Sequence, residues 1–157
     1  MKFIRDWIDH FSLYLNRGAV VKGIVQVDTF HRDQNDCTIR SLMVIKGYSY
    51  RNARRRAEQK GRKRKDGMYL SSLCWLTKSE GCRHVQIYDK DLAYHVLDRF
   101  KSYEFCGTKS LSEFARTTRS GNFLILIPGH ALVLKDGILY GNGDERSREY
   151  VQLVFEF

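Results

Sequence analysis

Hydrophobic residues in the first third of the chain follow two helical patterns separated by a strand pattern. From Phe3 to Leu15 they recur every three or four residues, which predicts a helix with one apolar face. The β-branched stretch Val20–Val27 predicts a strand, and a polar loop follows it. Helical spacing returns from about Asp36 to Lys46, where Gly47 is placed to end the helix.

The middle of the chain is predicted to be mainly helical. A basic helix is expected over Tyr50–Gln59 and a short helix over Tyr69–Leu76. The segment His84–Tyr88 is typical of a strand. Asp91 is then expected to cap a helix that reaches Phe100, because a carboxylate at this position can accept from the first free N–H groups.

The last third is predicted to be a sheet preceded by one helix, which a capping box begins at Ser110–Glu113. Strands are expected over Phe123–Ile127, His130–Leu134 and Ile138–Tyr140. In Tyr150–Phe157 apolar and polar residues alternate, as in a strand with one face in solvent. Helices followed by an antiparallel sheet indicate an α+β fold, and 157 residues suit one domain over residues 1–157.

Composition excludes some classes of protein. The hydrophobic fraction of 43% is ordinary for a globular chain. Charges interrupt the first residues, so no secretory leader is expected, and the longest apolar stretch is too short to cross a bilayer. The four cysteines have no regular spacing. We therefore expect reduced thiols in a cytoplasmic protein that has no cofactor and no membrane partner.

The net charge of +9 is concentrated in one segment, residues 51–65. Nine basic residues and one acidic residue, Glu58, leave this segment at +8. Such a patch attracts nucleic acid or an acidic protein, although a solvated helix with a mobile loop explains it equally well. The predicted basic patch comprises Arg51, Arg54, Arg55, Arg56, Arg62, Lys63, Arg64 and Lys65, with Lys60 as the ninth basic residue of the segment.

Cys37 and His130 are the residues whose settings indicate catalysis. Cys37 stands where a polar loop meets a predicted helix. A thiol there ionises more readily because the free N–H groups and the helix dipole favour negative charge. His130 begins a strand of the predicted hairpin. If the fold brings the two together, they form a nucleophile–base pair, whereas separately they are an inert thiol and an ordinary strand histidine.

The motifs around these residues resemble those of the papain-like cysteine peptidases, especially the small bacterial and bacteriophage members. The segment Asn35-Asp36-Cys37-Thr38-Ile39-Arg40 is similar to their Asn-Asp-Cys-x-x-Arg motif, and Gly129-His130-Ala131 to their Gly-His-Ala motif. The likeness extends from about Asp33 to Tyr140. It implies that the nucleophile helix packs on an antiparallel sheet that presents the histidine. It also implies a bacterial cytoplasm, or the host cytoplasm for a viral protein.

The resemblance also implies an oxyanion hole beside the thiol. The backbone N–H of Cys37 and an upstream side-chain amide are the natural donors. That amide belongs to Gln34 or Asn35, and we favour Gln34.

The residue that orients His130 is less clear from the sequence, because the family's usual acid position is Gly141 here. A two-residue hairpin turn would place Gly143 opposite the histidine, whereas a three-residue loop would place Asn142 there. We favour the three-residue loop and therefore Asn142 as the third catalytic residue, with Asp144 as the alternative.

The sequence thus predicts a cysteine peptidase that cleaves a protein or peptide acyl bond through a thioacyl intermediate. An isopeptidase, an amidase or an acyl transferase would use the same pair. The alternative is a non-catalytic papain-like module that binds nucleic acid or an acidic partner through residues 51–65. A zinc site is the main rival chemistry, but its four candidate ligands lack C-x-x-C spacing, so no metal is expected. Those ligands are Cys74, Cys82, His84 and Cys106.

Overall fold

The computed structural model describes residues 25–26, 35–141 and 148–157. The predicted helix over Phe3–Leu15 and most of the predicted strand Val20–Val27 lie outside these ranges. The helices are α2 (Cys37–Lys46), α3 (Tyr50–Gln59), α4 (Leu70–Ser79), the 3₁₀ turn η2 (Lys90–Leu92), α5 (Tyr94–Leu97) and α6 (Leu111–Thr117). The strands are β1 (Val25–Gln26), β2 (His84–Ile87), β3 (Tyr103–Phe105), β4 (Asn122–Ile127), β5 (His130–Lys135), β6 (Ile138–Gly141) and β7 (Leu153–Glu156).

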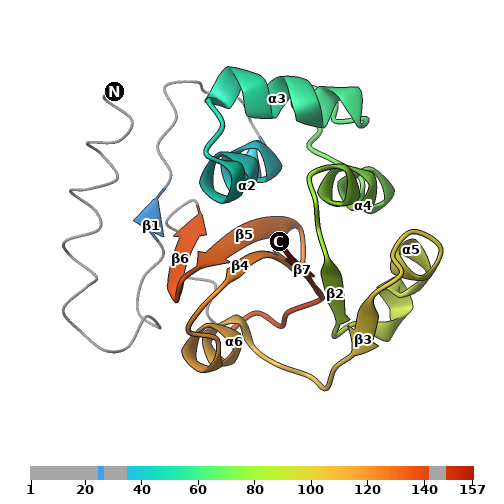
Figure 1. Cartoon of the computed structure of the whole chain (residues 1–157), viewed down its shortest axis with the longest axis vertical. Helices are drawn as coiled ribbons and strands as arrows, with labels where there is room; N and C mark the ends of the chain where they lie inside the picture. The colour runs from blue at the N-terminus through green and yellow to red at the C-terminus, as the bar shows by residue number, and fades with distance from the viewer. Residues whose placement is uncertain (1–24, 27–34, 142–147) are drawn as a thin grey trace.

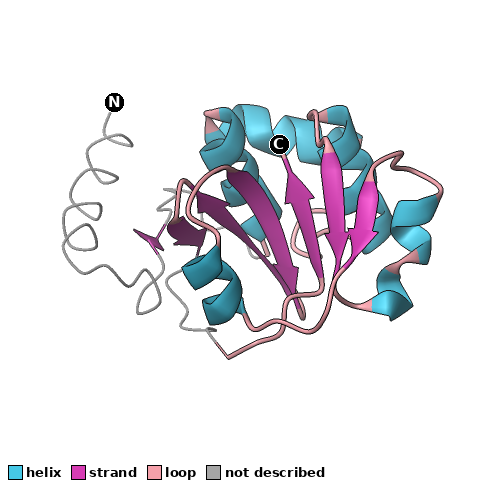
Figure 2. Cartoon of the chain, turned by 60° about the horizontal axis from the view of Figure 1, so that its bottom comes forward, coloured by secondary structure: helices cyan, strands magenta, loops and turns pink. Residues whose placement is uncertain are grey.

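One sheet of seven strands forms the centre of the molecule, in the order β1-β6-β5-β4-β7-β2-β3. Its inner strands pair in antiparallel fashion, whereas each edge strand pairs in parallel: β1 with β6, and β3 with β2. Figure 2 shows the strands side by side with helices against them. The α+β class is therefore confirmed, and the expectation of a purely antiparallel sheet is wrong at both edges.

Helices cover the two faces of the sheet unequally (Figure 1). On one face α2, α4 and α5 pack through residues such as Val44, Leu73 and Val96. On the other face α6 packs through Leu111 and Phe114. Helix α3 does not reach the sheet: its buried residues pack against α2 and α4 in a separate apolar cluster. The result is a sheet with a double helical layer on one side and one short helix on the other.

Local signals explain the helix boundaries that the sequence predicts correctly. Gly47 ends α2 in a left-handed conformation, with φ 69°, and donates its N–H to the Met43 carbonyl at 3.0 Å. The Ser49 hydroxyl caps α3 by accepting from the Asn52 N–H at 3.2 Å. The Ser110 hydroxyl likewise accepts from the Glu113 N–H at 3.2 Å, which confirms the predicted start of α6.

Other predicted elements differ from the structure. Asp91 does not begin a helix; instead the Asp89 carboxylate accepts from the Asp91 N–H at 3.0 Å and starts the short turn η2. Strand β3 was not predicted, and all three of its residues are exposed. The strand predicted within Tyr150–Phe157 is found as β7, but its predicted solvent face is wrong, because β7 lies in the middle of the sheet. Leu153 packs on the α2 face and Val154 on the α6 face.

Two tight turns set the register of the last hairpins. Gly129, with φ 68°, closes the turn between β4 and β5 and pairs Ile127 with His130. Asp136 and Gly137 have φ values of 49° and 81°, the conformation that a two-residue turn of the I′ type requires. In the part of the chain that the structure describes, no helix has the length and apolar character needed to span a membrane.

Candidate active site

Cys37 and His130, far apart in the sequence, line the same cleft. The cleft has a volume of about 490 Å³ and lies at the N-terminus of α2, beside the turn between β4 and β5. We call it the Cys37 cleft. Its lining residues are Asn35, Asp36, Cys37, Thr38, Asp66, Gly67, Met68, Leu70, Leu73, Leu92, Leu126, Gly129, His130, Ala131 and Gln152.

Cys37 is the first residue of α2, and its thiol is free and half-buried. The ten-residue helix directs its N-terminal N–H groups to this end, where they favour negative charge. Asp36 occupies the N-cap position but does not cap the helix with its side chain. Its buried carboxylate instead accepts from the Arg40 guanidinium at 2.8 Å. This ion pair offsets the negative charge next to the thiol.

His130 begins β5 and is only 7% exposed. Side chains alternate along a strand, so His130 shares a sheet face with Leu132 and Leu134, which pack on α6. It borders the Cys37 cleft at the end of the sheet, where its neighbours Gly129 and Ala131 also line the cleft. Among the described residues that line the cleft, it is the one histidine.

The predicted three-residue hairpin loop is wrong. Lys135 pairs with Ile138, so the turn consists of Asp136 and Gly137 alone. Aspartate tolerates the left-handed conformation that the first turn position needs. The Asp136 N–H also donates to the Gly121 carbonyl at 2.8 Å. The register argument for Asn142 therefore no longer holds. Asn142 and Asp144 themselves lie outside the described residues.

Of the two predicted oxyanion-hole amides, the structure describes Asn35 and not Gln34. Asn35 is exposed and has a left-handed backbone, with φ 58°. Its side-chain NH₂ donates to the Lys65 carbonyl at 2.7 Å. The observed role of this amide is therefore to connect the segment before Cys37 to the basic loop.

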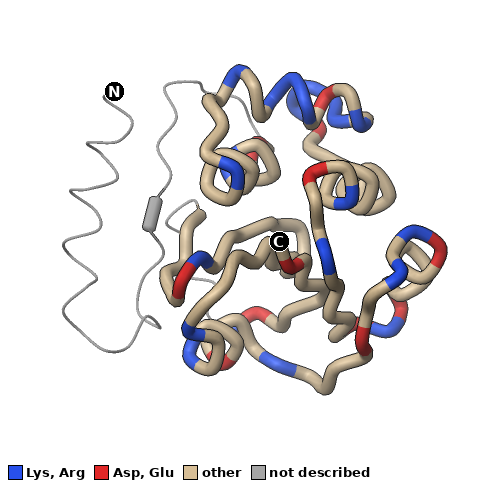
Figure 3. The backbone as a smooth tube through the Cα atoms, viewed as in Figure 1, with Lys and Arg blue, Asp and Glu red and all other residues tan. Residues whose placement is uncertain are grey.

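The structure divides the predicted basic patch (Figure 3). Arg62 is buried, with 4% exposure, so its prediction as a surface residue is wrong. Arg54 pairs with Glu58 at 2.7 Å and Arg56 with Glu80 at 3.0 Å. The exposed members fall into two groups, one on α3 and one in the loop after it: Arg51 and Arg55, and Lys63, Arg64 and Lys65.

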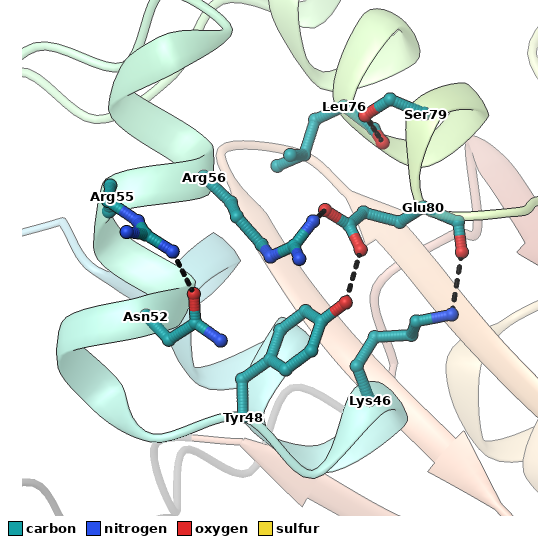
Figure 4. A network of polar contacts seen from close by, with 8 residues as sticks. All are labelled: Lys46, Tyr48, Asn52, Arg55, Arg56, Leu76, Ser79 and Glu80. Carbon is teal, nitrogen blue, oxygen red and sulfur yellow. Dashed lines mark hydrogen bonds and ion pairs between the residues drawn. The ribbon is translucent and has the colours of Figure 1, made fainter.

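Glu80 gathers three segments into one polar network (Figure 4). One carboxylate oxygen accepts from Arg56, and the other accepts from the Tyr48 hydroxyl at 2.9 Å. The Glu80 carbonyl accepts from Lys46 Nζ at 2.8 Å. The Arg56 guanidinium also lies 4.6 Å from the centre of the Tyr48 ring, within range of a cation–π contact. Arg56 therefore serves the junction of α2, α3 and α4.

The candidate zinc ligands serve other purposes. Cys74 lies in the core, and burial raises its pKa to about 12. Burial also raises the pKa of Cys82 to about 12, and its thiol donates to the His84 carbonyl at 3.4 Å. Cys106 lines a different pocket, together with Tyr88 and Phe114. Within the described ranges, no three His, Cys, Asp or Glu residues are grouped as a metal site would require.

Sequence reasoning missed part of the cleft wall. Asp66, Gly67 and Met68 line it because the loop after α3 turns back toward the start of α2. The alternation expected in the last strand assigned Gln152 to a solvent face, and no local signal places it in the cleft. Comparison with models of known families, with curated proteins and with solved structures finds no match for this chain.

Proposed function

We propose that the chain is a papain-like cysteine hydrolase, most simply a peptidase, with Cys37 as nucleophile and His130 as base. The observation that supports this most strongly is that both residues line one cleft. The remaining lining mixes polar and apolar residues, and apolar ones such as Met68, Leu73 and Leu92 suit a polypeptide side chain.

The proposed chemistry follows from the two groups. The Cys37 thiolate attacks the carbonyl carbon of the substrate and forms a thioester as the C–N bond breaks. The proton that His130 took from the thiol passes to the departing amine. Water then adds to the thioester with His130 as base, and the acid product and the thiol are released. In this proposal the N-terminal N–H groups of α2 stabilise the oxyanion.

Alkylation by iodoacetamide at about pH 7.5 tests the nucleophile. We expect Cys37 to react at least about 100-fold faster than Cys74 or Cys82, because thiols with a pKa of about 12 are almost fully protonated there. Peptide mapping by mass spectrometry gives the rate at each site. If Cys37 reacts no faster than the other thiols, the hydrolase proposal fails.

The variant His130→Ala tests the base separately. We expect alkylation of Cys37 to slow about tenfold, because the imidazole no longer takes the thiol proton. His84→Ala is the matched control, since His84 does not line the Cys37 cleft and should leave the rate unchanged. Strand alternation places the His130 side chain on the α6 face with Leu132, so this variant also tests whether the imidazole reaches the thiol at the end of the sheet. An unchanged rate in His130→Ala would rule out this histidine as the base.

A further inference from the structure

The loop after α3 forms one rim of the Cys37 cleft. The Lys63 N–H donates to the Gly67 carbonyl at 3.2 Å, and these two residues form an isolated antiparallel bridge that closes the loop. Asp66 and Gly67 form the side of the loop that lines the cleft, and the chain continues into Met68. The three residues before them are consecutive exposed cations outside the cleft lining, Lys63, Arg64 and Lys65.

The rim is connected directly to the segment that carries the thiol. Asn35 lies two residues before Cys37, and its side-chain NH₂ donates to the Lys65 carbonyl. Both ends of this hydrogen bond have left-handed backbones, with φ 58° at Asn35 and 70° at Lys65. Gly67 also approaches closely, since a Cβ there would lie 3.3 Å from the Asn35 Cβ. Left-handed residues of this kind cost energy and cluster where binding requires a defined geometry.

Within the described ranges, the charges of the rim are not neutralised by ion pairs. None of the three cationic side chains forms an ion pair with a residue that the structure describes. On α3, by contrast, Arg54 and Arg56 each have a carboxylate partner. Asp66 is the one acidic residue of the loop 63–66, so three positive charges and one negative charge leave +2. A cationic rim of this kind raises the local concentration of anionic ligands.

The cleft that the rim borders favours polypeptide over nucleic acid. Among the described residues that line it there is no Phe, Tyr or Trp side chain on which a base could stack. Its apolar walls, with Leu70 and Leu126, instead accept an aliphatic side chain. A ligand that satisfies both features has carboxylates near an apolar residue.

We propose that the loop 63–66 selects acidic polypeptide segments for the Cys37 cleft. Asp or Glu carboxylates of the substrate bind Lys63, Arg64 and Lys65, while an adjacent apolar side chain enters the cleft. This inference rests on the proposed hydrolase function for its biological meaning, but binding itself requires no catalysis.

Two alkylating reagents measure the potential at the thiol. Iodoacetate is anionic and iodoacetamide is neutral, and both react with the same thiolate. The iodoacetate rate divided by the iodoacetamide rate therefore does not depend on how much thiolate is present. In a variant with Lys63→Glu, Arg64→Glu and Lys65→Glu, we expect this ratio at Cys37 to fall about tenfold at about 10 mM salt, and about twofold at 0.15 M. In the variant with Gln at all three positions, the logarithm of this ratio should fall by about half as much, because the charge changes by half as much.

The matched control reverses three exposed cations away from the cleft, Arg51→Glu, Arg55→Glu and Lys101→Glu. It has the same change in net charge, and its ratio should change by less than about twofold, because screening limits distant charges. An equal fall in both variants, or none in the loop variant, would overturn the proposal.

Protection of Cys37 from iodoacetamide identifies the ligand class. The probes are a capped pentapeptide with four Asp or Glu residues around a leucine, a twin peptide in which Asn and Gln replace those acids, and a single-stranded DNA oligonucleotide. We expect the acidic peptide to protect at least about fivefold better than its twin, with this difference lost in the loop variant. Stronger protection by the oligonucleotide would overturn the choice of polypeptide. These readouts need no turnover, so they stand apart from the hydrolase test, which compares Cys37 with the other thiols.

Discussion

The two ends of α2 differ in how their polar groups are treated. At the C-terminal end, Gly47 closes the helix, and Lys46 and Tyr48 both donate to Glu80. At the N-terminal end, Asp36 leaves the helix without a side-chain cap, and one of its buried carboxylate oxygens has no hydrogen-bond partner among the described residues. One end is a closed junction between helices, and the other opens into a cleft.

This difference separates structural polar residues from residues available for chemistry. A buried carboxylate that accepts from several donors contributes to stability and leaves little capacity for a ligand. Cationic side chains that no described carboxylate pairs, left-handed non-glycine residues and a free thiol are costly or reactive features. Because these features occur together at the N-terminal end of α2, that end is where we place the function.

The largest effect on stability is expected at the junction, from Glu80→Ala. The change removes the partner of Arg56 and Tyr48 and should lower the free energy of unfolding by about 3 kcal/mol, because the remaining groups lose a buried acceptor. Urea denaturation measures it, and the alkylation rate of Cys37 should not change.

The exposed pair on α3 is the control for this prediction. Glu58→Ala removes the partner of Arg54 and should cost only about 0.3 kcal/mol, because both side chains are well exposed. If Glu80→Ala costs no more than Glu58→Ala, the junction does not stabilise the helical layers and the contrast between the two ends disappears.

A smaller effect for each residue is expected from pH, through two thiols that burial keeps protonated. Burial raises the pKa of Cys74 and Cys82 to about 12, whereas in the unfolded chain these thiols ionise near pH 8.5. The unfolded state therefore releases protons first as the pH rises. The contribution of the two thiols to the free energy of unfolding is complete below about pH 8, and it is lost progressively between pH 8 and pH 12.

At about pH 10 the loss should reach about 2 kcal/mol for each thiol. Urea denaturation of Cys82→Ala at several pH values tests this through the slope with pH, since loss of packing affects all pH values equally. A slope equal to that of the unmodified protein would show that Cys82 ionises as readily in the folded state as in the unfolded state.

A smaller effect than that of either thiol is expected at the cleft, from Asn35→Ala. Loss of the bond to Lys65 and a left-handed alanine should together cost about 1 kcal/mol. Asn35→Gly loses the same bond but relieves the backbone, so it should cost about 0.5 kcal/mol or less. Equal costs for the two variants in urea denaturation would mean that backbone strain is not stored beside the thiol.

Several elements could be predicted because their determinants are local. The helix from Cys37 to Lys46 follows from apolar spacing and from Gly47, and α6 follows from the Ser110 cap. Strand β3 could not be predicted, because it forms only by pairing in parallel with β2, and no residue of it is buried. The hairpin register depended on Asp136 adopting a left-handed conformation, which neighbouring contacts with Gly121 favour.

The candidate site divides in the same way. From the sequence alone came the α+β class, the thiol at a helix N-terminus, the histidine at the start of a strand, and the excess of cations over residues 51–65. Tertiary structure alone decided that Cys37 and His130 line one cleft, that Arg62 is buried and Arg56 paired, and that the 63–66 loop forms the rim of that cleft. The physical reason is that apolar spacing and helix capping act over a few residues. Whether a charged side chain stabilises the fold or is free to bind a ligand depends instead on partners, such as Glu80, that only the folded chain brings near.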